Sequence, residues 1–362
     1  MKADVTSELR EILGCYDIGE LVDWERNERG YVNTSYAIET VVNGGKHKYF
    51  LRKYKRGIRE QELRFEHSVI NHLAEQGFEL VARVFKTRDG ETYVRRWENK
   101  EDVFYAVFDF LPGEDRYTWI NPACSDGEVE KAAVVLARFH NAVMGFAPAG
   151  ERDEPRIIEL LPIIGENVAK GAAKIKQTAF DACLLEHQQS IQKNVAGTLR
   201  ALGVAECKEV VHLVNHCDYH PGNLKFRNGD ITGLFDFDWS KIDARCFDVA
   251  LAMLYFFADW GEGRDGAFDL DQAALFLKAY QRTLEGGPEL APMSDAELEC
   301  LPHMINASNL YVLNWTIEDF YAREVDPEEY LIYLRHGVQV MRWLGDEGNW
   351  AALKRTIASA KM

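Results

Sequence analysis

The stretch NHCDYHPGNLKFRNGDITGLFDFDWS, residues 215–240, carries acidic and amide side chains on both sides of a predicted hairpin turn. Apolar residues lead into Asp218 before the turn and into Asp236 after it, and Asn228-Gly229-Asp230 is the expected turn. Two adjoining strands would therefore carry carboxylates to the same area. Because a carboxylate in apolar surroundings is costly unless it is paired or bound to a cation, the pattern indicates a functional site.

The order of the polar residues in this stretch indicates phosphoryl transfer. Asn223 follows Asp218 by five residues, and Asp236 lies 18 residues after Asp218. Such a reaction requires one carboxylate to accept a hydroxyl proton and two oxygen ligands for Mg²⁺. The alternative is a pair of Asx turns beside a hairpin. That alternative explains Asn228 and Asp230 well, but it explains the other three residues together poorly.

Two motifs in this stretch resemble those of the aminoglycoside phosphotransferase, choline kinase and type II homoserine kinase superfamily. The first is His216-Cys217-Asp218 with Asn223, and the second is Phe235-Asp236-Phe237-Asp238. The resemblance covers most of the chain and implies a protein-kinase-like fold. It also implies that Asp218 is the catalytic base and that Asn223 and Asp236 are the metal ligands.

Four further residues gain an expected role from this resemblance. Cys217 stands where the family usually has Gly, so we expect the loop to avoid a conformation open only to Gly. His220 lies where protein kinases place a phosphate-contacting Lys, and a plain loop histidine fits equally well. His140 lies on the apolar face of a predicted helix and is expected to be a satisfied core histidine. Asp248 is expected to cap the helix that it opens or to brace the catalytic loop.

The stretch ERGYVNTSYAI, residues 28–38, resembles the phosphate-binding loop of the same family. Backbone N–H groups and short hydroxyls at its turn would lie over the phosphates of ATP, and the expected turn residues are Gly30, Asn33, Thr34 and Ser35. An ordinary hairpin turn would have much the same sequence. The chain has no G-x-x-x-x-G-K-[ST] motif, which disfavours the Walker class of NTPase. Residues 108–114 resemble the connection whose backbone holds the adenine.

The strand YFLRKY, residues 49–54, is expected to supply a cation to the phosphates. Side chains alternate along a strand, so Arg52 and Lys53 point to opposite faces. The family places its cation directly after the leucine, which is Arg52 in this chain. Glu66 lies within the apolar stripe of a predicted helix over 60–76, and a buried charge there favours an ion pair with Arg52. A solvated Glu at the helix edge is the alternative.

The secondary-structure pattern predicts an α+β protein of two lobes. A short helix is expected over 7–14, and alternating segments over 31–42, 46–54, 82–96 and 102–111 predict antiparallel hairpins, with turns at Asn43-Gly44-Gly45 and Asp89-Gly90. Most of 126–205 and 246–360 is predicted to be helical. We therefore expect a small nucleotide-binding N-lobe over 1–110 with one main helix, and a larger, mostly helical C-lobe over 111–362 with the catalytic loop and the substrate-binding helices.

Composition limits the possible partners and the location. The net charge of −16 disfavours nucleic acid and anionic membranes, and the longest apolar run, 249–258, is too short to span a bilayer. The seven cysteines form no CxxC pair, and the first residues have no apolar signal core. These features predict a cytoplasmic protein with reduced, buried thiols and no disulfide frame. The oligomeric state stays open.

Together these features predict a kinase that uses ATP and Mg²⁺ to phosphorylate a hydroxyl of a small molecule. Homoserine, choline-like amines, aminoglycosides and free sugars cannot be ranked from the residues. Aromatic and acidic residues within 306–326 (Tyr311, Trp315, Glu318 and Asp319) would suit an amine-bearing alcohol, but a helical core edge with a solvated acidic face gives the same pattern. The competing class is a non-catalytic nucleotide-binding module, a pseudokinase, which usually lacks the base, a metal ligand or the phosphate cation.

Overall fold

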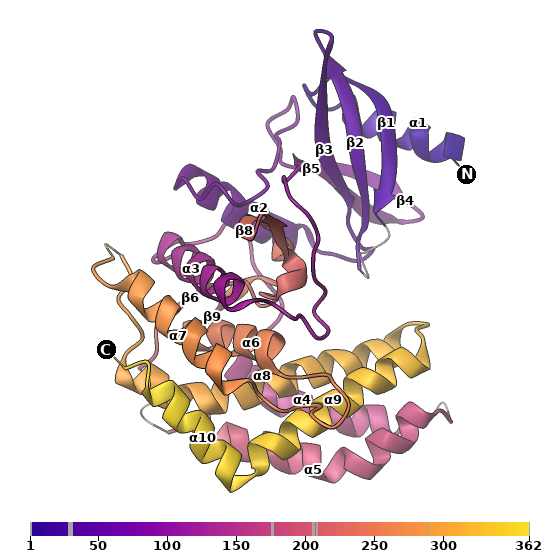
Figure 1. Cartoon of the computed structure of the whole chain (residues 1–362). Coiled ribbons are helices and arrows are strands. Elements are labelled where there is room, and N and C mark those ends of the chain that lie inside the picture. Colours follow the sequence, from indigo (N-terminus) through magenta and orange to yellow (C-terminus); the bar gives the residue numbers. More distant parts are fainter. Residues whose placement is uncertain are drawn as a thin grey trace. The chain divides into compact units, whose positions relative to one another are not determined.

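The computed structural model describes residues 2–27, 32–174, 177–204, 207, 209–287 and 289–361. The chain forms two compact units, and Figure 1 labels most of their elements. The first unit comprises Met1–Gly113, Ala147–Arg152 and Thr232–Asp238, and the second comprises Glu114–Phe146, Asp153–Ile231 and Trp239–Met362. The first unit is therefore discontinuous in the sequence, because two short later segments complete it.

A five-stranded antiparallel sheet with the strand order β1-β2-β3-β5-β4 forms the centre of the first unit. Its strands are β1 (Glu20–Asn27), β2 (Thr34–Val42), β3 (Gly45–Lys53), β4 (Val94–Glu98) and β5 (Glu101–Asp109). Strands β2 and β3 meet at Asn43 and Gly44, whose φ angles are 51° and 82°. Two consecutive positive φ angles suit a tight hairpin, as the Asn-Gly-Gly sequence predicted.

Helices α1 (Lys2–Leu13) and α2 (Glu60–Glu75) pack on opposite faces of this sheet. Leu51 of β3 belongs to the same buried cluster as Leu9 and Ile12 of α1. Arg52, the next residue, points to the other face and bonds to Glu66 of α2. The alternation of side chains along β3 therefore separates an apolar face from a polar one, as predicted.

Two predictions for the first unit were wrong. Strand β1, with the sequence ELVDWERN, was not predicted, because an edge strand rich in charged residues lacks the usual apolar alternation. The segment 82–96 was predicted as a hairpin around Asp89-Gly90. Only β4 at its end is a strand, while Val84 forms an isolated bridge with Phe108. The prediction relied on local alternation of side chains, which does not show whether a segment has a partner strand.

The second unit is mostly helical, as predicted. Its helices are α3 (Asp126–Ala142), α4 (Ile157–Ala172), α5 (Ala179–Leu202), α6 (Arg245–Phe257), α7 (Leu270–Leu284), α8 (Asp295–Ala322), α9 (Pro327–Gly345) and α10 (Glu347–Ala358). Strands β6 (His212–Asn215) and β9 (Lys241–Ala244) form an antiparallel pair. Strand β7 (Leu224–Arg227) pairs with β8 (Asp230–Leu234) through the predicted turn at Asn228 and Gly229, and the last three residues of β8 belong to the first unit. Helix α6 is buried along almost its whole length and forms the core of this unit.

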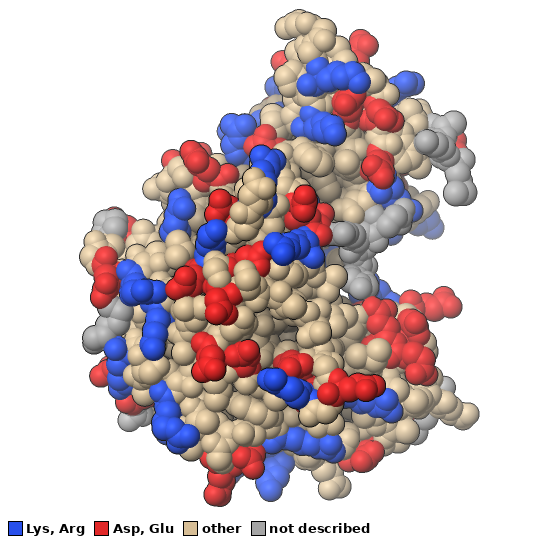
Figure 2. All heavy atoms as spheres, viewed as in Figure 1, with Lys and Arg blue, Asp and Glu red and all other residues tan. Residues whose placement is uncertain are grey.

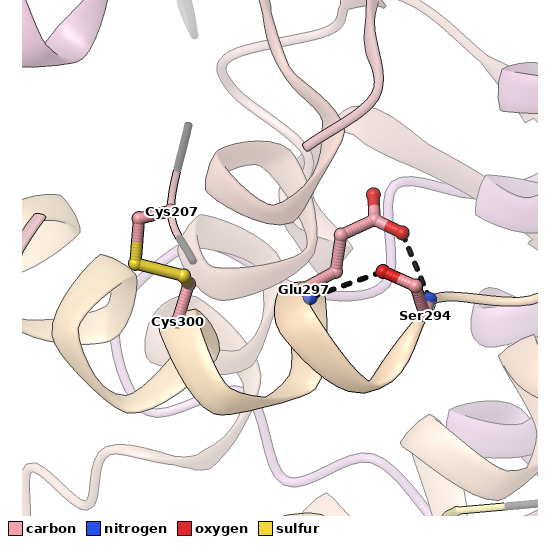
Figure 3. The surroundings of a disulfide bond; sticks show 4 residues. All are labelled: Cys207, Ser294, Glu297 and Cys300. Atoms are coloured by element: carbon pink, nitrogen blue, oxygen red, sulfur yellow. Dashed lines mark hydrogen bonds between the residues drawn. A yellow bond between two sulfur atoms is a disulfide. The ribbon is translucent and has the colours of Figure 1, made fainter. Parts of the chain in front are cut away.

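A disulfide joins Cys207 to Cys300 in the second unit (Figure 3), and the two Cα atoms lie 5.6 Å apart. Cys300 follows the first turn of α8, where Ser294 and Glu297 form a reciprocal capping box, a common way to begin a helix. Glu297 also pairs with buried Arg245 of α6, at 2.6 Å from Nη2 to Oε2. The prediction that the chain has no disulfide was wrong, because a pair 93 residues apart leaves no signal in the cysteine spacing.

The exposed side chains carry both signs of charge. On the face shown in Figure 2, Lys and Arg are interspersed with Asp and Glu. Within the described part of the chain, no helix is both long enough and apolar enough to cross a membrane.

Candidate active site

Asp218 lies in the turn that follows β6. Leu213 and Val214 of β6 are buried, and Asn215 donates from Nδ2 to the carbonyl of Ala244 on β9, at 2.9 Å. The apolar lead-in seen in the sequence is therefore a buried strand. It places the Asp218 carboxylate at the end of a fixed element.

Buried Asp248 holds the backbone of this turn. Its Oδ2 accepts the N–H of His216 at 2.7 Å, and its Oδ1 accepts that of Cys217 at 2.9 Å. Of the two predicted roles, Asp248 therefore has the bracing one. His140 bonds to Asp248 through Nε2, at 3.0 Å, and to Tyr280 through Nδ1, at 2.7 Å, so it is a satisfied core histidine, as predicted.

Cys217 has a left-handed backbone conformation, with φ at 61°. We expected the loop to avoid conformations open only to Gly. The left-handed region disfavours a side chain but does not exclude it, and a residue stays there when its surroundings fix it. The two hydrogen bonds to Asp248 provide that constraint.

Three side chains surround the Asp218 carboxylate. Asn223 donates from Nδ2 to Oδ2 at 2.8 Å, and His220 Nε2 lies 3.5 Å from the same oxygen. Because His220 Nδ1 accepts the N–H of Gly222 at 3.0 Å, the neutral ring carries its proton on Nε2, on the Asp218 side. The hydroxyl of Tyr255, on α6, also lies near Asp218 and is affected by its negative charge. His220 is thus a neighbour of the predicted base.

The environment of Asp218 favours its ionised form. Burial alone would raise the pKa of Asp218, but the nearby His220 and His216 and the hydrogen bond from Asn223 hold that pKa below its usual value. Burial and the negative charge of Asp218 raise the pKa of Tyr255 well above its usual value. Tyr255 therefore stays protonated at neutral pH beside an ionised carboxylate.

In the first unit, Arg52 forms the ion pair predicted from the sequence. Its Nη1 lies 3.0 Å from Oε1 of Glu66, and both side chains are buried. Lys53 points to the opposite face, where its Nζ pairs with Glu8 of α1 at 2.7 Å. The alternative of a solvated Glu66 is excluded, because this residue is 2% exposed.

Arg52 also contacts Asp236, which the sequence analysis did not foresee. Its Nη2 donates to Oδ1 of Asp236 at 3.0 Å. Asp236 has φ at 69°, a left-handed conformation that is uncommon for a residue other than Gly. One guanidinium therefore joins Glu66 of α2 to the predicted metal ligand, and all three residues belong to the first unit.

A buried polar network lies around Glu66. Tyr54 donates to its Oε2 at 3.0 Å and lies 2.9 Å from Nε2 of His67. Burial raises the pKa of Glu66 to about 7, although Arg52 opposes this shift. Burial and the positive charge of Arg52 lower the pKa of His67 to about 3, so this histidine is neutral.

The residues of the predicted phosphate loop differ from expectation. Gly30 lies outside the described residues. Thr34 and Ser35 are not in a turn, because they are the first two residues of β2, where Ser35 is the cross-strand partner of Arg52. Asn33 donates from Nδ2 to Oδ2 of Asp238 at 2.9 Å and accepts the N–H of Lys55 at 2.9 Å. Its side chain therefore anchors the start of β2.

The predicted metal ligands have suitable donor atoms for Mg²⁺. Asn223 uses its amide N–H groups on Asp218, which leaves the amide oxygen to act as a ligand. Asp236 supplies a partly exposed carboxylate. Amide and carboxylate oxygens are hard donors of the kind that Mg²⁺ prefers, and phosphate oxygens and water complete such sites.

Sequence reasoning gave no role to Tyr255 or Asp238. Tyr255 lies within an apolar run, and nothing in that run marks one aromatic residue as a neighbour of the base. Asp238 belongs to the second motif, and its burial beside Asn33 gives it a structural role there.

Comparisons with known proteins bear on the fold and on the family motifs. The sequence profile of the phosphotransferase enzyme family matches residues 23–287. The homoserine kinase of Parvibaculum lavamentivorans is 26% identical over 340 residues, which cover 91% of this chain and 92% of that protein. An aminoglycoside phosphotransferase from Alicyclobacillus acidocaldarius superposes with a TM-score of 0.61, at 17% identity over 96% of both chains. A microcompartment-associated aminopropanol kinase gives a TM-score of 0.67, at 15% identity over 97% of this chain and 99% of the other. These similarities confirm the fold predicted from the motifs.

Proposed function

The chain belongs to the phosphotransferase enzyme family, as its motifs predicted, and we propose that it transfers the γ-phosphoryl group of ATP to a hydroxyl of a small amine-bearing molecule. The surroundings of Asp218 carry this proposal. A carboxylate kept ionised by His220 and Asn223, on a turn fixed by Asp248, is the acceptor that a substrate hydroxyl needs.

The predicted base, cation and metal ligands have distinct roles in this reaction. The hydroxyl oxygen of the acceptor attacks the γ-phosphorus, and its proton passes to Asp218. The bond from the γ-phosphorus to the bridging oxygen breaks, and ADP leaves with that oxygen. Arg52, positioned by Glu66, would bind phosphate oxygens. These oxygens would replace the Asp236 carboxylate on the guanidinium, and Asp236 would then be available as a metal ligand.

Mg²⁺ would be held by the Asn223 amide oxygen and the Asp236 carboxylate. When bound, it would neutralise charge on the phosphates. We place the adenine at the backbone of residues 108–114. Thr34 and Ser35, the N-terminal residues of β2, would lie near the phosphates. Because the reaction consumes ATP, we propose a cytoplasmic location.

The amine-bearing acceptor is supported by the relatives at 26% identity, whose substrate homoserine has both an amine and a hydroxyl. This class also includes the amino alcohols. A free sugar lacks the amine, and we rank it as an acceptor below homoserine and the amino alcohols.

The test is ADP release in the presence of a panel of alcohols, with Asp218→Asn as the matched inactive variant. We expect turnover that depends on MgATP, on the alcohol and on Asp218. A protein that binds MgATP but turns over no alcohol in the panel would be the non-catalytic nucleotide-binding module, and the proposal would be wrong.

A further inference from the structure

A second pocket of the helical unit lies between α5 and α9, two helices that pack against each other. It encloses about 390 Å³, which is within the range of sites for small molecules. Cys183 and His187 line it from α5, and Arg335, Val338 and Arg342 line it from α9. We call the pocket lined by these residues the arginine groove. None of them belongs to the candidate active site.

The spacing of these residues along each helix directs their side chains to one face. On α9, Arg335, Val338 and Arg342 follow one another at intervals of three and four residues, so they form a single stripe. The two arginines are two helical turns apart, which is about 10.5 Å along the helix axis at 1.5 Å per residue. Cys183 and His187 are four residues apart on α5 and share a face in the same way. The two helices therefore direct both guanidinium groups and both α5 side chains to one groove.

The two arginines of the groove are not neutralised by the protein. In the described part of the chain, neither forms an ion pair with a carboxylate, and Arg342 donates from Nη1 to Oε1 of Gln339 at 3.4 Å. One acidic residue, Glu186, lines the groove. Its side chain is 73% exposed, and its Oε1 lies 3.8 Å from Nε2 of His187. The groove is therefore locally positive in a chain whose net charge is −16.

The thiol of Cys183 lies within the field of both arginines. Burial raises the pKa of this thiol, and the positive charges of Arg335 and Arg342 oppose the shift. The side chain is only half-buried, so a small reagent can reach it from the groove. Cys183 is therefore a natural reporter for whatever binds between α5 and α9.

The chemistry of the groove suits an organic anion with more than one charged group. A guanidinium group presents its N–H donors in a planar fork that fits carboxylate and phosphate oxygens. Because Arg335 and Arg342 are two turns apart, each can bind a different anionic group of one ligand. Buried Val338 lies between them on the same stripe and offers an apolar surface to the carbon skeleton of that ligand.

We propose that the arginine groove binds a small organic anion that carries two or more phosphate or carboxylate groups. The groove is a binding site in addition to the candidate active site, and none of its residues takes part in the proposed phosphoryl transfer. The inference therefore stands or falls independently of the kinase function.

Alkylation of Cys183 tests the inference on the native protein. Pyrophosphate is the probe for phosphate groups and citrate the probe for carboxylates, and peptide mass spectrometry follows the reaction of each thiol with iodoacetamide. At about ten times its Kd, a bound probe should slow alkylation of Cys183 about tenfold, because only the unoccupied protein reacts. Cys15, a free cysteine of the first unit, is the internal control and should react at an unchanged rate.

The two probes distinguish the two kinds of anionic group. Protection of Cys183 by pyrophosphate alone would assign the groove to phosphates, and protection by citrate alone would assign it to carboxylates. Protection by neither probe, or equal protection of Cys183 and Cys15, would overturn the inference.

A matched pair of double variants tests the role of the two arginines. Arg335→Gln with Arg342→Gln removes two exposed cations, and the Kd of the protecting probe should rise at least about tenfold with the loss of two charge-assisted contacts. Arg200→Gln with Arg355→Gln is the control, because it removes the same charge from exposed positions outside the groove.

Calorimetric titration without Mg²⁺ measures these Kd values and does not depend on the reactivity of Cys183. Binding of a probe at the candidate active site would be the same in both double variants, so the comparison isolates the groove. The control should bind like the native protein. Equal Kd values for the two double variants, or no binding to the native protein, would overturn the inference.

Discussion

Asp218 and Asp236 have different surroundings, so their loss should have different consequences. Asp218→Asn removes the proton acceptor, and we expect turnover to fall by about 10²- to 10⁴-fold with little change in MgATP affinity. Asp236→Asn removes a charged metal ligand, so MgATP affinity itself should fall, and added Mg²⁺ should restore part of it. Nucleotide titration and steady-state rates measure both effects.

The opposite pattern would refute this division of roles. Normal turnover in Asp218→Asn, or an equal loss of MgATP affinity in both variants, would show that the two carboxylates do not act separately on proton and metal.

Arg52 and Lys53 form a matched pair of neighbouring cations on opposite faces of β3. Arg52→Ala should raise KM for ATP strongly and remove the ion pairs that Arg52 makes with Glu66 and Asp236. Lys53→Ala removes a partly exposed pair with Glu8, an interaction worth about 0–1 kcal/mol, and should change KM for ATP little. A larger effect from Lys53→Ala would show that the phosphates bind on the face of β3 that carries Lys53, and the assignment to Arg52 would be wrong.

At the scale of elements, the contact between β3 and α2 should depend on pH. The pKa of buried Glu66 is about 7, above its unfolded value of 4.5, so between these values only the folded protein holds this proton. Stability from this group is therefore present below pH 4.5 and is lost as the pH rises to about 7. We expect the melting temperature of the native protein, relative to that of Glu66→Gln, to fall as the pH rises from about 4.5 to about 7.

Thermal melts of both proteins across this pH range measure the effect. A difference in melting temperature that does not change with pH would show that Glu66 ionises with an ordinary pKa.

Predictability from sequence also differs between kinds of contact at this scale. The pair of Arg52 with Glu66 was predicted because strand alternation and helix periodicity are local, and each fixes one side chain on a known face. The proximity of Tyr255 to Asp218 and the bond from Arg52 to Asp236 involve residues that no local sequence pattern relates. Strand β1 was missed because its residues are polar, and 82–96 was overpredicted because alternation does not ensure a partner strand.

At the scale of the whole molecule, the disulfide closes a long segment of chain. Cross-linking residues 93 apart restricts the unfolded chain, and a disulfide of this kind contributes about 2–4 kcal/mol. Reduction should therefore lower the melting temperature of the native protein and leave that of a Cys207→Ser, Cys300→Ser double variant unchanged. Thiol titration of the unsubstituted protein, denatured without a reducing agent, should find the 5 free cysteines. A titre of all 7 would show that the bond is absent.

The discontinuity of the first unit has a consequence for exchange of parts between homologous genes. A single crossover near residue 113 would bring Arg52 and Glu66 from one parent and Asp236, within Thr232–Asp238, from the other. Arg52 and Asp236, whose side chains bond at 3.0 Å, would then come from different parents. A chimaera keeps Arg52, Glu66 and Asp236 from one parent only when the transplanted fragment also carries residues 232–238.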